Sequence, residues 1–399
     1  MNLRSFGLAI GLVLVAAVGT KAADIKLPVL VSPAPPVQPQ MVGRFAVRPA
    51  KNFNLRAAQA QATAGTTVPL WLRTLSSGGT HYTFQMVGKN PFVVLTVPSS
   101  NIKAVIIPLR LVFQSFGNTT FDPSIADPTC SPAGPAVRLV KASPLFNDIA
   151  AYPGGTSVGT GEYVDLFQRA NYFSKTNSTT GINPNYHVIL NYAQSPVVTV
   201  PVTGGDVVAG TCGNLGLMDF STWDTYLQTQ LFPLLASQSP QIAPPITLPI
   251  FLLYNVVLYN GSESSCCILG YHSAFSDPAY SSAFHTYASV EFDTNRSFSG
   301  VDDISAMSHE IAEWMDDPAG NNPTPSWGNV GQVSGCQANL EVGDPLSGTL
   351  AQIYMSANRY TYHVQDLAFT SWFYGQKPST GVNGWYSFLG SFLAPAAPC

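Results

Sequence analysis

Charged side chains are scarce in this chain. Aspartate, glutamate, lysine and arginine make up only 10% of its 399 residues, with 18 basic and 22 acidic side chains. No stretch gathers several lysines or arginines. Nucleic-acid binding draws on a basic patch that neutralises phosphates, so the composition excludes a nucleic-acid partner. The uncharged polar residues that replace the charged ones are typical of a loop-rich, β-rich protein outside the cell.

Long apolar runs are also scarce, and the clearest one lies near the start. Arg4 precedes the apolar run 6–18, and small residues follow it. This order is typical of a signal peptide, which we assign to residues 1–22. The run 246–258 is interrupted by Asn255 and predicts a buried strand. We therefore expect a secreted or periplasmic protein with no membrane span after signal removal.

Cysteine is limited to six residues, an even number. In an exported chain this favours disulfide bonds, up to three of them. Adjacent cysteines fit the preferred disulfide geometry poorly. We therefore expect Cys266 and Cys267 to bond to two distant partners rather than to each other.

The chain divides into three parts after the signal peptide. Residues 23–66 are rich in proline, alanine and glutamine, which favours a linker, a surface arm or a propeptide. Residues 67–150 form a predicted β-rich region, and residues 151–399 a predicted mixed domain. The predicted fold class is therefore α+β.

The pattern of apolar residues predicts the individual elements. β-branched and aromatic residues between turn formers predict strands, and a 3.6-residue apolar period predicts helices. The predicted strands are 82–88, 92–98, 103–113, 136–141, 185–192, 196–202, 246–260 and 285–293, and the predicted helices are 160–173, 219–237 and 302–317.

The helix predicted at 302–317 carries an unusual amount of chemistry. One face is apolar, and the opposite face brings His309, Glu313 and Asp316 within reach of one another. The segment HEIAE begins like the zinc-binding pattern His-Glu-x-x-His, with Glu313 in the place of the second histidine. Two ligands one turn apart on a helix hold an ion rigidly, so His309 and Glu313 are predicted metal ligands. Glu310 is the predicted catalytic base, which takes a proton from the attacking water.

Further ligands must come from outside the helix. The segment EVGDPL (341–346) offers Glu341 or Asp344 as the third metal ligand. His363 is a further candidate, either as a ligand or as a catalytic donor to the transition state. For His272 two interpretations stay open, a core histidine or a residue that approaches the same cleft. We expect a divalent metal, zinc first, although the second carboxylate shifts the preference toward harder ions such as Mn²⁺ or Ca²⁺.

The arrangement SHEIAEWMDDP (308–318) followed by EVGDPL resembles a variant of the zincin metallopeptidase helix. Locally it is also similar to the plant phosphate-induced (EXORDIUM) family, and most of the mature chain resembles exported proteins of soil bacteria with no assigned activity. The zincin resemblance implies a zincin-like domain over 151–399, the family roles for His309 and Glu310, and a strand SVEFD (289–293) that edges the cleft. The histidine role does not carry over to Glu313.

Two hypotheses of function follow. The first is an exported metal-dependent hydrolase, peptidase-like, which acts on a peptide or a cell-surface polymer through Glu310. The alternative is a non-catalytic secreted or cell-surface binding protein on a degenerate zincin scaffold. A simpler interpretation also stays open, an amphipathic helix with a solvated polar face and no metal. A weaker enzyme alternative is a serine hydrolase built on Ser157 in GTSVG, a segment that a Gly-rich loop explains better.

Overall fold

The protein belongs to the α+β class. Strand accounts for 39% and helix for 21% of the chain, which confirms the predicted class. The signal peptide predicted at 1–22 and the loop residue Ser157 lie outside the described residues. No helix among the described residues is long and apolar enough to cross a membrane. The computed structural model describes residues 27–33, 42–51, 53–131, 133–149, 158–261, 266–277 and 281–399.

One mixed sheet forms the centre of the molecule. Its strand order is β1-β8-β5-β11-β14-β13-β12-β10-β9, while β6 and β7 pair with β5 and β2 pairs with β13. The strands are β1 (Leu30–Ser32), β2 (Arg44–Arg48), β5 (Ser100–Phe113), β6 (Thr119–Phe121), β7 (Val188–Gln194), β8 (Val198–Gly204), β9 (Asp206–Ala209), β10 (Asn214–Asp219), β11 (Thr247–Tyr254), β12 (Val256–Tyr259), β13 (Cys266–Asp277) and β14 (Ser281–Phe292).

Three two-stranded sheets and several helices surround this sheet. The small sheets are β3 with β4, β15 with β16 and β17 with β18. These elements are α1 (Leu55–Thr63), β3 (Leu70–Ser77), β4 (Thr80–Val87), α2 (Ala136–Lys141), α3 (Tyr163–Asn171), α4 (Phe173–Thr176), α5 (Phe220–Tyr226), α6 (Phe232–Ser237), α7 (Ser305–Asp316), β15 (Pro323–Val330), β16 (Val333–Asn339), β17 (Leu350–Met355), β18 (Tyr360–Gln365) and α8 (Thr370–Phe373).

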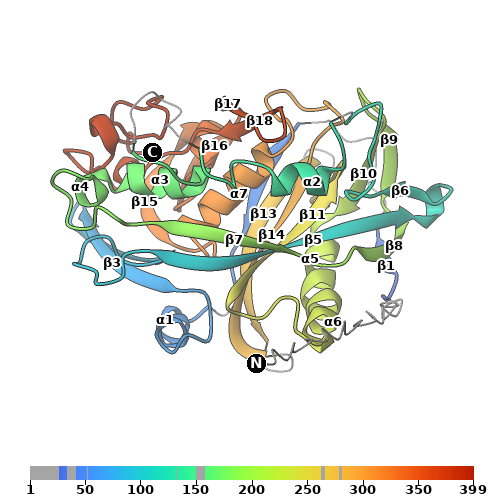
Figure 1. Ribbon diagram of the computed structural model, residues 1–399, viewed down its shortest axis with the longest axis horizontal. Helices are drawn as coiled ribbons and strands as arrows, with labels where there is room; N and C mark the ends of the chain where they lie inside the picture. Colours follow the sequence, from blue (N-terminus) through green and yellow to red (C-terminus); the bar gives the residue numbers. More distant parts are fainter. Residues whose placement is uncertain are drawn as a thin grey trace, which may run out of the picture.

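The two faces of the sheet carry separate cores. Helices α2, α3 and α7 lie on one side of β5, and α5 and α6 lie on the other (Figure 1). Side chains alternate between the faces along a strand, so Ile106 and Ile107 of β5 belong to different cores. This layering places α7 inside the molecule, between the sheet and the C-terminal part of the chain.

The predicted boundary at residue 150 does not separate two sheets. β5, from the predicted β-rich region, pairs in parallel with β7, β8 and β11 from the region after it. A strand with neighbours on both sides must belong to the same core as those neighbours. The two predicted regions therefore share one central sheet.

Two predicted strands are wrong. Residues 136–141 form helix α2, because Ala136, Val137, Leu139 and Val140 are buried at helical spacing after a proline. Residues 92–98 are irregular, because the side chain of Asn183 takes the place of a partner strand. Its amide donates hydrogen bonds to the carbonyls of Pro91 and Val93, and its oxygen accepts one from the Leu95 N–H.

Part of the predicted linker 23–66 has regular structure. Its described residues include the strands β1 and β2 and the helix α1. Asn54 caps α1 by accepting a hydrogen bond from the Ala57 N–H at 3.0 Å. Proline and alanine content therefore misled the prediction, because short strands and a short helix gain their stability from packing onto the sheet.

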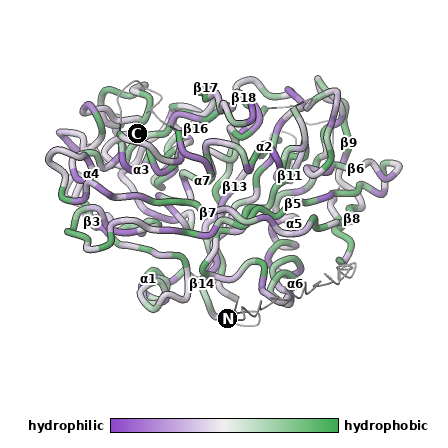
Figure 2. The backbone as a smooth tube through the Cα atoms, viewed as in Figure 1, coloured by the Kyte–Doolittle hydropathy of each residue, from purple (hydrophilic) through white to green (hydrophobic). Residues whose placement is uncertain are grey.

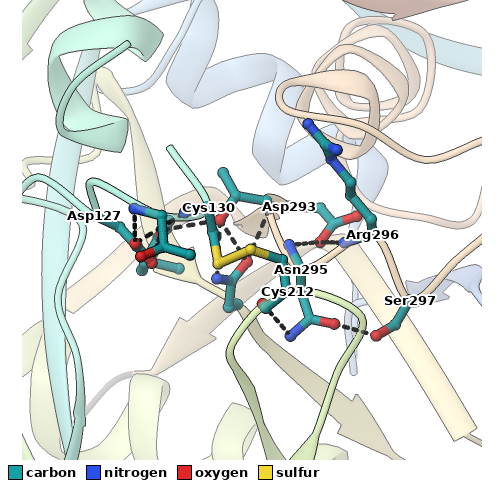
Figure 3. The surroundings of a disulfide bond; sticks show 11 residues. Asp127, Cys130, Cys212, Asp293, Asn295, Arg296 and Ser297 are labelled. Atoms are coloured by element: carbon teal, nitrogen blue, oxygen red, sulfur yellow. Dashed lines mark hydrogen bonds between the residues drawn. A yellow bond between two sulfur atoms is a disulfide. The ribbon is translucent and has the colours of Figure 1, made fainter. Parts of the chain in front are cut away.

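Three disulfide bonds join the six cysteines: Cys130–Cys212, Cys266–Cys267 and Cys336–Cys399. The expectation of distant partners for Cys266 and Cys267 is wrong, because the other four cysteines pair among themselves and leave none. In Figure 3 the Cys130–Cys212 bond lies beside the turn that follows β14, where the Asn295 side chain donates to the Cys212 carbonyl. Three disulfides indicate an oxidising compartment.

Candidate metal centre

Helix α7 is buried on every side. All twelve of its residues are buried, including His309, Glu310, Glu313 and Asp316. The helix contains both hydrophilic and hydrophobic residues although it lies inside the molecule (Figure 2). The interpretation of a solvated polar face is therefore wrong for this helix. Ionisable groups in such a place need partners, because an isolated buried charge is costly.

Two glycines let neighbouring segments approach the helix closely. A Cβ atom on Gly270 of β13 would lie 2.8 Å from Glu310 Cγ. A Cβ atom on Gly343 would lie 2.4 Å from His309 Nδ1. The missing side chains therefore make room for the two polar side chains of α7.

His309 and Glu313 meet each other and the segment after β16. His309 Nε2 lies 3.0 Å from Glu313 Oε1 and 3.5 Å from Asp344 Oδ1. Glu313 Oε1 also accepts hydrogen bonds from the N–H groups of Gly343 and Asp344, at 3.0 and 3.3 Å. The structure thus brings His309, Glu313 and Asp344 close together.

A second histidine comes from strand β13. His272 Nδ1 lies 3.0 Å from Glu310 Oε2 and 3.7 Å from Glu313 Oε2. Its side chain is fully buried. Of the two interpretations left open for His272, the structure favours the one in which it approaches the helix. The central sheet thus places a second histidine beside the two glutamates of the His-Glu-x-x-Glu segment.

Glu341 completes the group. Ligand atoms of His272, Glu313 and Glu341 lie within 4.8 Å of one another, and so do those of His309, Glu310 and Glu313. The two sets share Glu313. Asn339 donates a hydrogen bond to Glu341 Oε1 at 2.9 Å. We call His272, His309, Glu310, Glu313 and Glu341 the buried His/Glu cluster.

The cluster contains polar atoms that have no hydrogen-bond partner among the described residues. They are His272 Nε2, both ring nitrogens of His309, Glu310 Oε1 and Glu341 Oε2. The contact between His309 Nε2 and Glu313 is close but lacks hydrogen-bond geometry. Leaving so many buried polar atoms unpaired is costly, and bound ions are a common way to pair them.

Burial and neighbouring charges set the pKa values of the cluster. Burial raises the pKa of Glu310 to about 7, although a hydrogen bond from His272 opposes the rise. Burial and the charge of Glu313 hold the pKa of Glu341 well above its ordinary value. Burial also disfavours ionised Glu313, but the charge and hydrogen bonding of His309 together with the charge of His272 lower its pKa below the ordinary value. For His309 burial favours the neutral ring, yet the surrounding carboxylates of Glu313, Asp344 and Glu310 together raise its pKa well above the usual range.

The spacing of the cluster fits a divalent ion. Two ligands of a tetrahedral zinc, each about 2.0–2.3 Å from the ion, lie about 3.3–3.8 Å apart. The distance from His272 Nδ1 to Glu313 Oε2, 3.7 Å, and that from His309 Nε2 to Asp344 Oδ1, 3.5 Å, lie in this range, and His309 Nε2 is somewhat closer to Glu313 Oε1, at 3.0 Å. Histidine nitrogen together with carboxylate oxygen is a donor set that zinc and manganese both accept. The residues present therefore fit such an ion.

Asp344 connects the cluster to the surface. Its side chain is 11% exposed and lines a cavity of about 720 Å³. Gln337 donates a hydrogen bond to Asp344 Oδ2 at 3.2 Å, and Gln332 donates one to Oδ1. The cavity is also lined by β2 and by the segment 299–301. It lies beside the cluster, with Asp344 between the two.

Two predicted residues lie elsewhere. The ring of His363 on β18 contacts Asp303 at 2.9 Å and Gln352 at 3.2 Å, so it belongs to the N-terminal end of α7. The side chain of Asp316 accepts hydrogen bonds from Gln168 and Asn171 of α3. The contacts of His363 give no support to its predicted catalytic role. Asp316 links helix α7 to helix α3.

The expectation that SVEFD (289–293) edges the cleft is wrong. This segment belongs to β14, which pairs with β11 on one side and β13 on the other. The cause is the long strand β13, which covers the side of β14 that would otherwise be open. The strand nearest to the cluster is β13, through Gly270 and His272.

The sequence gave one weak sign of the part that His272 plays. In GYH (270–272), glycine and histidine stand two residues apart in a strand, so both face the same layer. The contact of Phe45 with His309 had no such sign, because it joins residues from opposite ends of the chain. Their rings stack with centroids 3.8 Å apart.

No protein-family model matches this chain, and neither a curated protein nor a solved structure matches it. The resemblance of SHEIAEWMDDP to the zincin helix therefore stays a prediction that rests on its own motif. What the chain does has to be argued from the buried His/Glu cluster itself.

Proposed function

We propose that this protein is an exported metal-dependent hydrolase with its metal in the buried His/Glu cluster. One observation carries the proposal. Five metal-ligating side chains from a strand, a helix and a loop form two groups that share Glu313, and several of their polar atoms lack a partner among the described residues. A divalent cation would satisfy those atoms and the surplus of carboxylates together.

The residues divide into ligands and a base. His272, His309, Glu313 and Glu341 would hold the ion, with zinc as the first expectation. A bound divalent ion supplies Lewis acidity, which polarises the bond under attack. Asp344 orients the site through its contact with His309 and faces the cavity.

Glu310 is the proposed general base. Its Oε1 has no hydrogen-bond partner among the described residues, while Oε2 is held by His272. A pKa of about 7 suits a group that both accepts and returns a proton near neutral pH. His272 would thus orient Glu310 as well as bind the ion.

The substrate class follows from the compartment. Three disulfides indicate an oxidising environment, so the proposed substrates are peptides or cell-surface polymers found there. The cavity beside Asp344 is lined mainly by small and uncharged polar side chains, which suits a polar chain such as a polypeptide backbone.

The burial of the cluster favours a second candidate function. His272, His309 and Glu310 are 0% exposed, which is also what a structural ion needs. In this alternative the protein is a secreted or cell-surface binding protein, and the ion stabilises the fold without turnover.

Metal content and one variant separate the candidates. Elemental analysis of the purified protein is expected to find about one equivalent of a divalent metal. Glu310→Gln should keep this metal and lose at least 100-fold in cleavage of fluorescently labelled casein, because a base and not the main ligand set is removed.

Glu162→Gln is the matched control, since Glu162 is another buried glutamate outside the cluster. It should retain both metal and activity. Metal with no activity in the unaltered protein would favour the structural ion. Less than a tenth of an equivalent after incubation with zinc, manganese or calcium would contradict both candidates.

A further inference from the structure

The outer edge of β13 is completed by a strand from the start of the chain. β12 pairs with β13 only as far as Ile268, whereas β2 pairs in parallel with Ile268–Ser273. Along Gly270–Ser273, β13 therefore has β14 on one side and β2 on the other. Removing β2 would leave a row of main-chain groups open beside the cluster, and extended polypeptides bind to such edges.

Phe45 of β2 covers the cluster directly. Its ring stacks on the imidazole of His309, at 3.8 Å between centroids and 22° between planes. Gln332 holds this residue in place from the other side of the site. Its amide oxygen accepts from the Phe45 N–H at 2.8 Å, and its amide nitrogen donates to the Phe45 carbonyl at 3.0 Å.

The segment is fixed at both ends of its path across the site. The Cys267 N–H donates to the Val42 carbonyl at 2.6 Å, and the Ala50 N–H donates to the Ala319 carbonyl at 2.9 Å. Its contacts are main-chain pairing with β13, the Phe45 ring over His309, and the side chains of Arg44 and Arg48, which bond to the Cys266 carbonyl and to Asp224. This is how an extended peptide is recognised by strand addition, with the main chain for affinity and a pocket for one side chain.

We propose that residues 42–50 are an internal ligand, lying in the groove where an extended polypeptide substrate would bind, with Phe45 in the place of a large apolar substrate side chain. This assignment rests on the proposed hydrolase function. It identifies the substrate class as an extended polypeptide. It also explains why the proposed catalytic residues are all present and yet buried. Displacement of β2 would join the cavity of about 720 Å³ to the cluster, because β2 forms one wall of that cavity.

A chain that can be cut beside β2 tests this assignment. Lys51 is exposed, so a site-specific protease sequence inserted directly after it is accessible. The fragment that ends there also carries β1, which pairs with β8. A second protease sequence is therefore inserted directly before Val42, which is also exposed. After both cuts, residues 42–51 are expected to dissociate on gel filtration while the rest stays folded. A fluorescent peptide copying residues 42–50 should then bind, and the same peptide with alanine in place of Phe45 should bind at least 10-fold more weakly.

Chemical access to His309 provides a second readout that needs no metal. After the fragment leaves, diethyl pyrocarbonate should modify His309 at least 10-fold faster than in the uncut chain. Two results would overturn the internal ligand: a fragment that stays bound after cutting, or a remainder that unfolds when it leaves, since both mark β2 as a structural strand. Because neither readout uses an ion, a chain without metal contradicts the proposed function and leaves this test decisive.

Discussion

His309 is enclosed on both faces of its ring. Phe45 stacks on one side and Gly343 approaches within the space of a side chain on the other. Such an enclosure fixes the direction of the ring nitrogens, which a metal ligand requires. A surface histidine that only improves solubility would need no such fixed orientation.

The contribution of His272 can be measured against that of His363. His272→Ala removes a proposed ligand that lies 3.7 Å from Glu313, so zinc affinity should fall about 100-fold or more. His363→Ala should leave the affinity within a factor of about three, because its ring contacts Asp303 and Gln352. Isothermal titration with zinc compares the two, and equal losses would place His363 in the site after all.

His285 makes the folding stability depend on pH. Burial lowers its pKa to about 4, below the value of about 6.5 in an unfolded chain. Between these values the unfolded state binds more protons, so the free energy of unfolding falls as the pH drops from about 6.5 to 4. The loss from this residue is on the order of 3 kcal/mol.

The variant His285→Phe isolates that effect. Its ring neighbours are Phe232 and Phe275, so an aromatic side chain suits the position. Urea unfolding at several pH values measures the difference in the free energy of unfolding between the unaltered protein and this variant. That difference should change by about 3 kcal/mol between about pH 6.5 and pH 4. His81→Phe, at an exposed position, is the control, and an unchanged difference for His285→Phe would refute the assignment.

At the scale of elements, α7 is held between β13 and the segment after β16. Gly343 has an ordinary helical backbone, with φ at −86°, so its missing side chain matters for space and not for conformation. Gly343→Ala would push a methyl group into the His309 ring. We expect a loss of about 1–3 kcal/mol in stability and at least 10-fold in zinc affinity.

Gly348→Ala is the control for that substitution, because its Cβ would meet open space. With φ at +82° it should cost only the roughly 1–2 kcal/mol of a left-handed backbone and leave zinc affinity unchanged. If Gly343→Ala binds zinc as tightly as the unaltered protein, the segment that contains Gly343 does not position His309.

Local patterns could predict the elements whose signals are local. The helix around HEIAE and the strands β5, β7, β8, β11 and β14 have clear apolar patterns, and prediction found them, whereas it missed β13. The segment 136–141 was predicted as a strand because short β-branched runs suit both a strand and a helix. The prediction of a strand at 92–98 was wrong because the side chain of Asn183, which is distant in sequence, forms hydrogen bonds with the main chain of this segment.

The candidate site could be predicted except for the part that the central sheet supplies. His309, Glu310 and Glu313 stand within one turn and need no knowledge of the fold. Glu341 and Asp344 were found because carboxylates are rare in this chain. The placement of His272 depends on the register of β13 against a helix 38 residues away, and a local pattern does not contain that register.

At the scale of the whole molecule, the disulfides differ in the length of chain that they close. The Cys130–Cys212 bond spans 82 residues, whereas Cys266 and Cys267 are neighbours. Loop entropy predicts about 4 kcal/mol of stability from the long loop and almost none from the adjacent pair. Urea unfolding of Cys130→Ala/Cys212→Ala should show this loss, with Cys266→Ala/Cys267→Ala as the comparison.

A larger loss from the adjacent pair than from the long loop would contradict the loop-entropy account. It would mean that the bond between neighbours shapes the end of β13, and so the strand that carries His272. The two double variants therefore also show whether the site depends on the disulfide at the end of β13 or on the strand pairing of the sheet.

The pairing of β2 with β13 has a consequence for the order of biosynthesis. Phe45 and Gln332 are 287 residues apart, so β2 leaves the ribosome long before its partners exist. Glu341 follows Gln332 closely, and the ligands and their cover therefore assemble at the same late stage. If the proposed site binds an ion, one present at that moment would enter an open site, whereas one that arrives later would have to wait for β2 to move. Under this proposal we expect refolding with zinc to load the protein faster than addition of zinc to the folded chain.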